Sequence, residues 1–186
     1  FRLAPGSDPV AQVGEFSMDS KAYLGWITPS AVTEAKTTGV YRVHRFDHKD
    51  AAGQAGNALA LNFRTLDGNR VWVGLRRGFV NNPLLSTGAY VVWAPRVREH
   101  QQIDCTPLSR IDPVVGKTYD LADLDREDSA LPTGMSWTTP DGSVRLTNLG
   151  TGGTAPQEYL DLRVEFMDSL PAAEFFTTSA ATTPGL

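Results

Sequence analysis

The chain has 186 residues, of which 41% are hydrophobic and 20% charged, and 17 Lys and Arg against 21 Asp and Glu give a formal net charge of -4. This is the composition of an ordinary globular protein, with enough apolar residues for a core that needs no metal or disulfide. The mild acidity argues against a nucleic-acid partner, which requires a basic face, and no apolar run approaches the roughly 18 residues that span a membrane.

The first part of the chain contains turn residues and then one short helical run. This run extends from Phe16 to Leu24 and is followed by Gly25, a residue that often ends a helix. A second run at residues 120–128 is acidic and weakly amphipathic, and it is the only other stretch with helical character. Helices therefore account for little of the predicted structure.

From Val40 onward the chain is a succession of short strand-like runs, separated by Gly, Pro, Asn and Asp. Two of the separators, Asp67-Gly68 and Asp141-Gly142, are typical of hairpin turns. Many short strands with such turns favour an antiparallel sandwich or barrel. The predicted strands are residues 40–46, 57–63, 70–75, 89–93, 143–149 and 160–166.

The segment His44-Arg45-Phe46-Asp47-His48 is similar to the zinc motifs of metallopeptidases, because two histidines lie four residues apart with an acid between them. Those motifs need a helix, since helical periodicity places residues i and i+4 side by side. Here the flanking residues predict a strand, and we interpret the pair as an exposed strand end. The other interpretation is a small metalloenzyme that uses His44, His48 and His100. We assign no metal, cofactor or catalytic residue.

Other candidate groups have simpler explanations. Cys105 is the only cysteine, so no intrachain disulfide can form; at the end of a predicted strand it is interpreted as a small buried hydrophobe, and its role stays open. Residues 150–154 are Gly-rich but lack the Lys of a phosphate-binding loop, and they predict a mobile hairpin loop. The acidic run at residues 120–128 predicts either a solvated loop or a calcium site, because calcium takes several oxygen ligands. Its acidic residues are Asp120, Asp123, Asp125, Glu127 and Asp128.

Exposed aromatic side chains on a sandwich could stack against sugars. Trp72 and Trp93 lie within apolar strands, however, where large aromatic side chains usually pack in the core. Only Trp137 lies near a turn. Because one aromatic side chain does not make a platform, the tryptophans of the strands predict no sugar-binding site.

Several segments, taken in chain order, resemble parts of a known enzyme family. The sharpest motif is Leu24-Gly25-Trp26 within residues 16–27, and the weaker ones are residues 32–43, 70–77, 88–93, 102–107 and 116–120. Together they resemble the downstream half of secreted zinc metallopeptidases of the gametolysin and immune-inhibitor-A-like kind. In that family, a segment similar to residues 16–27 lies just after the active site.

The chain also departs from the family pattern. The family holds its zinc with a His-Glu-x-x-His-x-x-Gly-x-x-His helix, which is absent here. Residues 7–14 resemble the family's Met-turn, but Val13 stands where methionine is expected. In the strand at residues 70–77, Val71 and Gly74 replace the family's tyrosine and glutamate, and Arg76 is kept. Either the chain is a fragment from downstream of the catalytic helix, or its lineage has lost peptidase activity.

The resemblance implies a mainly β protein with three parts. Residues 1–28 are expected to be the terminal segment of a metallopeptidase-like catalytic domain, with a short helix. Residues 29–176 are expected to form an antiparallel β-sandwich, and residues 177–186 a flexible Thr/Ser/Pro tail.

The same resemblance implies a secreted, extracellular protein whose sandwich is a non-catalytic accessory domain. The expected partners are an upstream catalytic-type domain or companion chain, which would hold the zinc, and an extracellular glycoprotein of a matrix or cell wall. No cofactor is expected within the chain itself. The alternative is an extracellular structural module, or one that binds carbohydrate or protein, with no peptidase activity.

Overall fold

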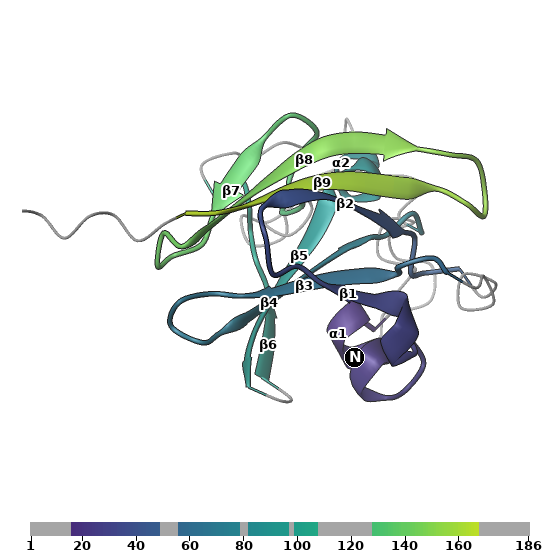
Figure 1. Cartoon of the computed structure of the whole chain (residues 1–186). Helices are drawn as coiled ribbons and strands as arrows, with labels where there is room; N and C mark the ends of the chain where they lie inside the picture. Colours follow the sequence, from purple (N-terminus) through teal and green to yellow (C-terminus); the bar gives the residue numbers. More distant parts are fainter. Residues whose placement is uncertain (1–15, 49–55, 79–81, 97–98, 108–127, 168–186) are drawn as a thin grey trace, which may run out of the picture.

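The computed structural model describes residues 16–48, 56–78, 82–96, 99–107 and 128–167. Within these ranges the chain is mainly β and forms two stacked sheets (Figure 1). One sheet has the strand order β1-β3-β4-β5-β6, with β1 Val32–Glu34, β3 Ala60–Arg64, β4 Arg70–Leu75, β5 Ala89–Arg96 and β6 Glu99–Gln102. The other has the order β2-β9-β8-β7, with β2 Gly39–His44, β7 Ser136–Thr138, β8 Val144–Gly152 and β9 Tyr159–Phe166.

Three short helices accompany the sheets in the described ranges: α1 Met18–Tyr23, the 3-10 helix η1 Pro29–Ala31 and α2 Pro83–Thr87. None of the described helices is long and apolar enough to cross a membrane. All described strand pairs are antiparallel except β1 and β3, which are parallel. They can be parallel because the chain crosses to the other sheet, as β2, before it returns.

The main core lies between the two sheets, where alternate side chains of each strand point inward. In the five-stranded sheet, the inward side chains of Leu61, Phe63 and Val73 are fully buried. The inward residues of the four-stranded sheet are also buried, and they are Val43, Val144, Leu146, Leu160, Leu162 and Val164. This alternation is the period-2 pattern that predicts half-buried strands in the sequence.

A second apolar cluster covers part of the outer face of the five-stranded sheet. It brings Met18 of α1 and Ile27 onto Trp72 of β4, together with Phe46 and Leu59. Gly74 makes this approach possible, since a Cβ atom there would lie 2.9 Å from Cδ1 of Phe46 and 3.1 Å from Cε of Met18. Residues 16–28 thus pack on the sandwich through a core of their own (Figure 1).

The structure confirms the fold class and the six predicted strands, which correspond to β2, β3, β4, β5, β8 and β9. The predicted run from Phe16 to Leu24 forms α1, and both Asp-Gly turns join adjacent antiparallel strands. The short strands β1, β6 and β7 are not among the six runs predicted from the periodicity, and β6 ends at Gln102, three residues before the strand end predicted at Cys105. The position of Val13, residues 120–127 of the acidic run 120–128 and the tail at 177–186 lie outside the described residues, whereas Asp128, the last residue of that run, is buried and not solvated.

Candidate functional site

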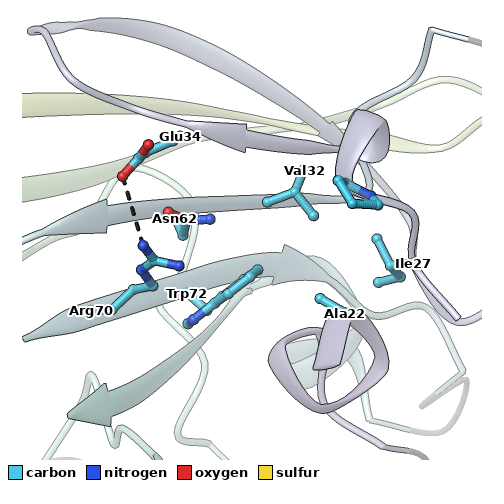
Figure 2. A pocket seen from close by; sticks show the side chains of 8 residues that line it. Ala22, Ile27, Val32, Glu34, Asn62, Arg70 and Trp72 are labelled. Carbon is cyan, nitrogen blue, oxygen red and sulfur yellow. Dashed lines mark ion pairs between the residues drawn. The ribbon is translucent and has the colours of Figure 1, made fainter. Parts of the chain in front are cut away.

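A shallow pocket of about 290 Å³ lies on the outer face of the five-stranded sheet, beside α1. Figure 2 shows that side chains from β1, β3, β4 and the α1 segment surround it. Its lining residues are Ala22, Ile27, Pro29, Val32, Glu34, Asn62, Arg70 and Trp72. The pocket therefore combines an apolar wall from residues 22–32 with three polar side chains from the strands.

The register of the sheet brings the polar residues of the pocket together. Glu34 of β1 pairs with Asn62 of β3, and Asn62 pairs with Trp72 of β4, so the three lie in one row across the sheet. Strand alternation points Leu61 and Phe63 into the main core and turns Asn62 to the outer face. The row joins the hairpin of β3 and β4 to β1, which lies 28 residues before Asn62 at its pairing position, Glu34.

Asn62 is the most unusual residue of the pocket. Its side chain is only 3% exposed, yet its Oδ1 atom has no hydrogen-bond partner within the described structure. A buried polar atom without a partner costs roughly 1–3 kcal/mol. Figure 2 shows the Asn62 amide on the sheet between Glu34 and Trp72, where a bound molecule can supply the missing donor.

Charged groups gather at one end of the pocket. The Glu34 carboxylate lies 3.9 Å from Nη2 of Arg70 (Figure 2), 3.9 Å from Nε of Arg64 and 3.4 Å from Nζ of Lys36. The Arg70 guanidinium also lies 5.9 Å from the centre of the Trp72 ring. These are long, partly exposed contacts, so Glu34 and Arg70 stay available to a ligand.

The chemistry of this lining suits binding. Asn62 Oδ1 and Glu34 can accept hydrogen bonds, Arg70 can donate them, and Val32 and Ile27 offer apolar surface. The lining residues include no Ser, Cys, His or Lys that could act as a nucleophile. The arrangement can hold a small polar molecule.

A second feature is an exposed apolar patch formed by Phe16, Tyr23, Leu24 and Trp26, whose exposed fractions lie between 48% and 57%. Phe16 and Trp26 are in edge-to-face contact, with ring centres 5.2 Å apart and an interplanar angle of 83°. We call this group the α1 patch. A cluster of large aromatic side chains on the surface is characteristic of a contact site.

The Leu24-Gly25-Trp26 motif also has a local structural role. Gly25 has φ of +76°. The N–H of Trp26 donates to the carbonyl of Lys21 at 2.8 Å, and the N–H of Gly25 donates to the carbonyl of Ala22 at 3.2 Å. This pair of bonds is a Schellman motif, which ends a helix and prefers glycine. Gly25 is therefore explained by helix capping, whereas the exposure of Leu24 and Trp26 is not.

The His44–His48 segment forms an ion-pair network. Arg45 donates through Nε to Asp47 at 2.9 Å and through Nη1 to Glu158 at 3.2 Å, and Asp47 also accepts the backbone N–H of Gly78. The Asp47 side chain is fully buried. This network links β2 to β9 and to the end of β4, and it is a structural use of the acid in the zinc-like motif.

His44 and His100 have different neighbours. His44 lies in β2 against the Tyr159 ring, and burial, with a smaller effect from Arg42, lowers the pKa of its imidazole. His100 lies in β6, with Nδ1 3.4 Å from Oδ2 of Asp19. Among the described residues, no three His, Cys, Asp or Glu side chains lie close enough to hold a metal ion. The structure thus offers no support for a three-histidine site.

The remaining predicted candidates occupy structural positions. Trp93 and Trp137 pack against the main core, and Trp72 belongs to the outer cluster. Cys105 is partly buried beside the main core, and burial, with the nearby Asp104 carboxylate, raises the pKa of its thiol to about 12. Gly150 to Gly152 are not a loop, because they complete β8 after a bulge that follows Asn148.

The chain was compared with protein-family models, with curated proteins and with solved structures, and none of the three comparisons found a match. The geometry of the pocket and of the α1 patch therefore carries the functional argument. Sequence reasoning missed Glu34, Asn62 and Arg70 of the pocket. The available signal was Asn62 itself, a polar residue at the centre of the apolar run Ala60-Leu61-Asn62-Phe63.

Proposed function

We propose that this chain is the non-catalytic accessory β-sandwich of a secreted metallopeptidase-like protein, and that it packs on the catalytic-type domain through the α1 patch. The proposal joins the motif resemblance to one observation, the exposure of Phe16, Tyr23, Leu24 and Trp26. In the resemblance, these residues belong to the terminal segment of the catalytic domain, which the sandwich follows. Large apolar side chains left at the surface there are explained if a second domain covers them.

The proposal gives the charged groups of the zinc-like segment a structural role. Arg45 pairs with both Asp47 and Glu158. The purified chain, incubated with zinc and casein, is expected to release no peptides. Turnover that a chelator abolishes, and that does not come from a contaminating protease, would overturn the proposal.

Docking is tested by adding the zinc-containing catalytic domain of a gametolysin-like peptidase and measuring association by sedimentation velocity. We expect a complex, and we expect Trp26→Ser and Phe16→Ser to weaken it at least tenfold, since buried aromatic side chains contribute about 2 kcal/mol or more at such contacts. Val40→Ser is the matched control, because Val40 is equally exposed but lies on the other sheet. Equal weakening by all three variants would show that the patch is not the contact.

A second candidate function is an extracellular binding module with no peptidase activity, recognising carbohydrate or protein. The observation that favours it is the pocket around Asn62, whose buried oxygen has no hydrogen-bond donor from the described chain. The two functions are compatible, because an accessory domain can both dock on an enzyme and bind the material that the enzyme acts on.

A further inference from the structure

We propose that the pocket formed by Glu34, Asn62, Arg70 and Trp72 binds a single neutral sugar ring, the terminal unit of a glycan. This inference deepens the proposed function, because it names the part of an extracellular glycoprotein that the domain recognises. It is carried by the buried oxygen of Asn62, the charges of the lining and the size of the pocket.

The first argument concerns the donor that Asn62 lacks. Its Oδ1 atom is buried in the pocket and unpartnered, so a ligand that donates a hydrogen bond there removes a penalty of roughly 1–3 kcal/mol. A purely apolar ligand would keep that penalty. A hydroxyl group donates one hydrogen bond and also accepts from a neighbour such as Arg70, so hydroxyl groups suit this mixture of groups.

The second argument concerns charge. The lining holds one carboxylate, from Glu34, and one guanidinium, from Arg70, and the two lie at the same end of the pocket; Arg64 and Lys36 also lie beside Glu34 but do not line the pocket. An anionic ligand would contact Glu34 and a cationic one would contact Arg70, and each would pay for a like-charge contact. A neutral ligand with several donors and acceptors avoids both contacts.

The third argument concerns shape. A volume of about 290 Å³ lies at the lower end of the range for small-molecule sites, so it fits one ring. At the other end of the pocket from Glu34 and Arg70, Ile27 and Val32 form an apolar wall (Figure 2), against which the C–H groups of a pyranose can pack. The hydroxyl groups of such a ring lie around its rim and its faces are partly apolar, which suits a lining with both polar and apolar groups.

The test uses the full chain, labelled with ¹⁵N, and three methyl glycosides: of mannose, of galactose and of N-acetylglucosamine. Methyl glycosides are used because their anomeric carbon is blocked, as in a glycan. At least one is expected to shift the side-chain amide signals of Asn62 and the indole N–H signal of Trp72 saturably, with a millimolar dissociation constant. Sodium acetate and a lysine-rich peptide serve as charged probes and are expected to shift neither signal.

Variants then connect the binding to the polar row. Asn62→Leu is expected to weaken binding about five- to tenfold, the effect of one lost hydrogen bond, as read from the Trp72 signal. Glu34→Gln removes a charge from a partly exposed position, where the fold tolerates change, and it is expected to weaken binding by a similar factor. Asn57→Leu is the matched control, because Asn57 is not among the lining residues.

Each outcome decides for or against the inference. Saturable shifts that Asn62→Leu and Glu34→Gln weaken, and Asn57→Leu does not, would support it. It is overturned if no glycoside gives saturable shifts, or if Asn62→Leu and Glu34→Gln leave the affinity unchanged. It is also overturned if acetate or the lysine-rich peptide shifts the Asn62 and Trp72 signals saturably. Failure here leaves docking untouched, because docking is measured with the Trp26 and Phe16 variants.

Discussion

Two buried asparagines allow a direct comparison between a structural amide and one that we propose contacts a ligand. Asn148 is fully buried and satisfied on both sides: its Nδ2 donates to the carbonyl of Leu131 at 2.8 Å and its Oδ1 accepts from the N–H of Gly150 at 2.8 Å. Asn62 is also buried, but it lines the pocket and its Oδ1 has no partner among the described residues. Replacing each with leucine, a side chain of similar size, is expected to change stability in opposite directions.

The expected magnitudes follow from the hydrogen bonds. In Asn62→Leu, an unpaired buried oxygen is replaced by methyl groups that pack beside Trp72 and Val32, so the free energy of unfolding is expected to rise by about 1 kcal/mol. For a chain of this length that corresponds to about 2–4 °C in the melting temperature. In Asn148→Leu, the Gly150 N–H loses the Asn148 oxygen, whereas the Leu131 carbonyl keeps the N–H of Ala89 at 2.9 Å, and the free energy of unfolding is expected to fall by about 2 kcal/mol.

Urea unfolding followed by tryptophan fluorescence measures both changes, and an unchanged dependence on urea would show that the two-state comparison holds. The reasoning is refuted if Asn62→Leu destabilises the protein as much as Asn148→Leu does. In that case the Asn62 amide would be supporting the sheet, and the pocket would lose its main argument. If Asn62→Leu is more stable than the natural protein but no longer binds sugar, the result would show that Asn62 supports binding at a cost in stability.

Three further outcomes are expected. Gly74→Ala should lower the free energy of unfolding by about 1–2 kcal/mol, because its Cβ would press on the Phe46 ring, whereas Gly39→Ala should have little effect, since the nearest atom to its Cβ would lie 3.6 Å away. Burial favours the protonated form of Asp141, but hydrogen bonds from Thr139, Ser143 and the Asp67 N–H outweigh it and hold its pKa at about 2, below its ordinary 3.8. Its stabilisation is therefore present above about pH 4 and lost as the pH falls toward 2, and acid-unfolding curves of Asp141→Asn should lack that part. Cys105, with its pKa of about 12, should react with iodoacetamide at pH 8 far more slowly in the folded than in the urea-unfolded protein, as followed by mass spectrometry.

The strands that could be predicted are those whose side chains alternate between core and solvent. Strands β8 and β9 show this pattern, because one face packs in the main core and the other is exposed. Strand β6, Glu-His-Gln-Gln, carries no hydrophobic alternation, and β1 and β7 have only three residues each. These short strands are held by pairing with a neighbour, and such long-range pairing leaves little trace in local sequence.

The pocket could not be predicted for a related reason. Its polar row exists only because β1 pairs in parallel with β3 at a register that sets Glu34 beside Asn62. Neither the pairing nor its register is contained in the sequence around any one of these residues. The zinc-like segment shows the converse, since a local pattern suggested a site, whereas its acid is used in an ion-pair network with Arg45.

The segment from Phe16 to Val32 ties the two proposed surfaces together. Its inner residues, Met18 and Ile27, are buried on the sheet and fix the position of α1. Ala22 and Val32 form part of the pocket wall, and Trp26 is exposed in the α1 patch. Helix capping and packing on the sheet explain Gly25, Met18 and Ile27. Neither of them requires apolar residues on the exposed side of the segment. The proposed partner would account for the aromatic exterior, and the same segment also shapes the pocket that we propose for the sugar.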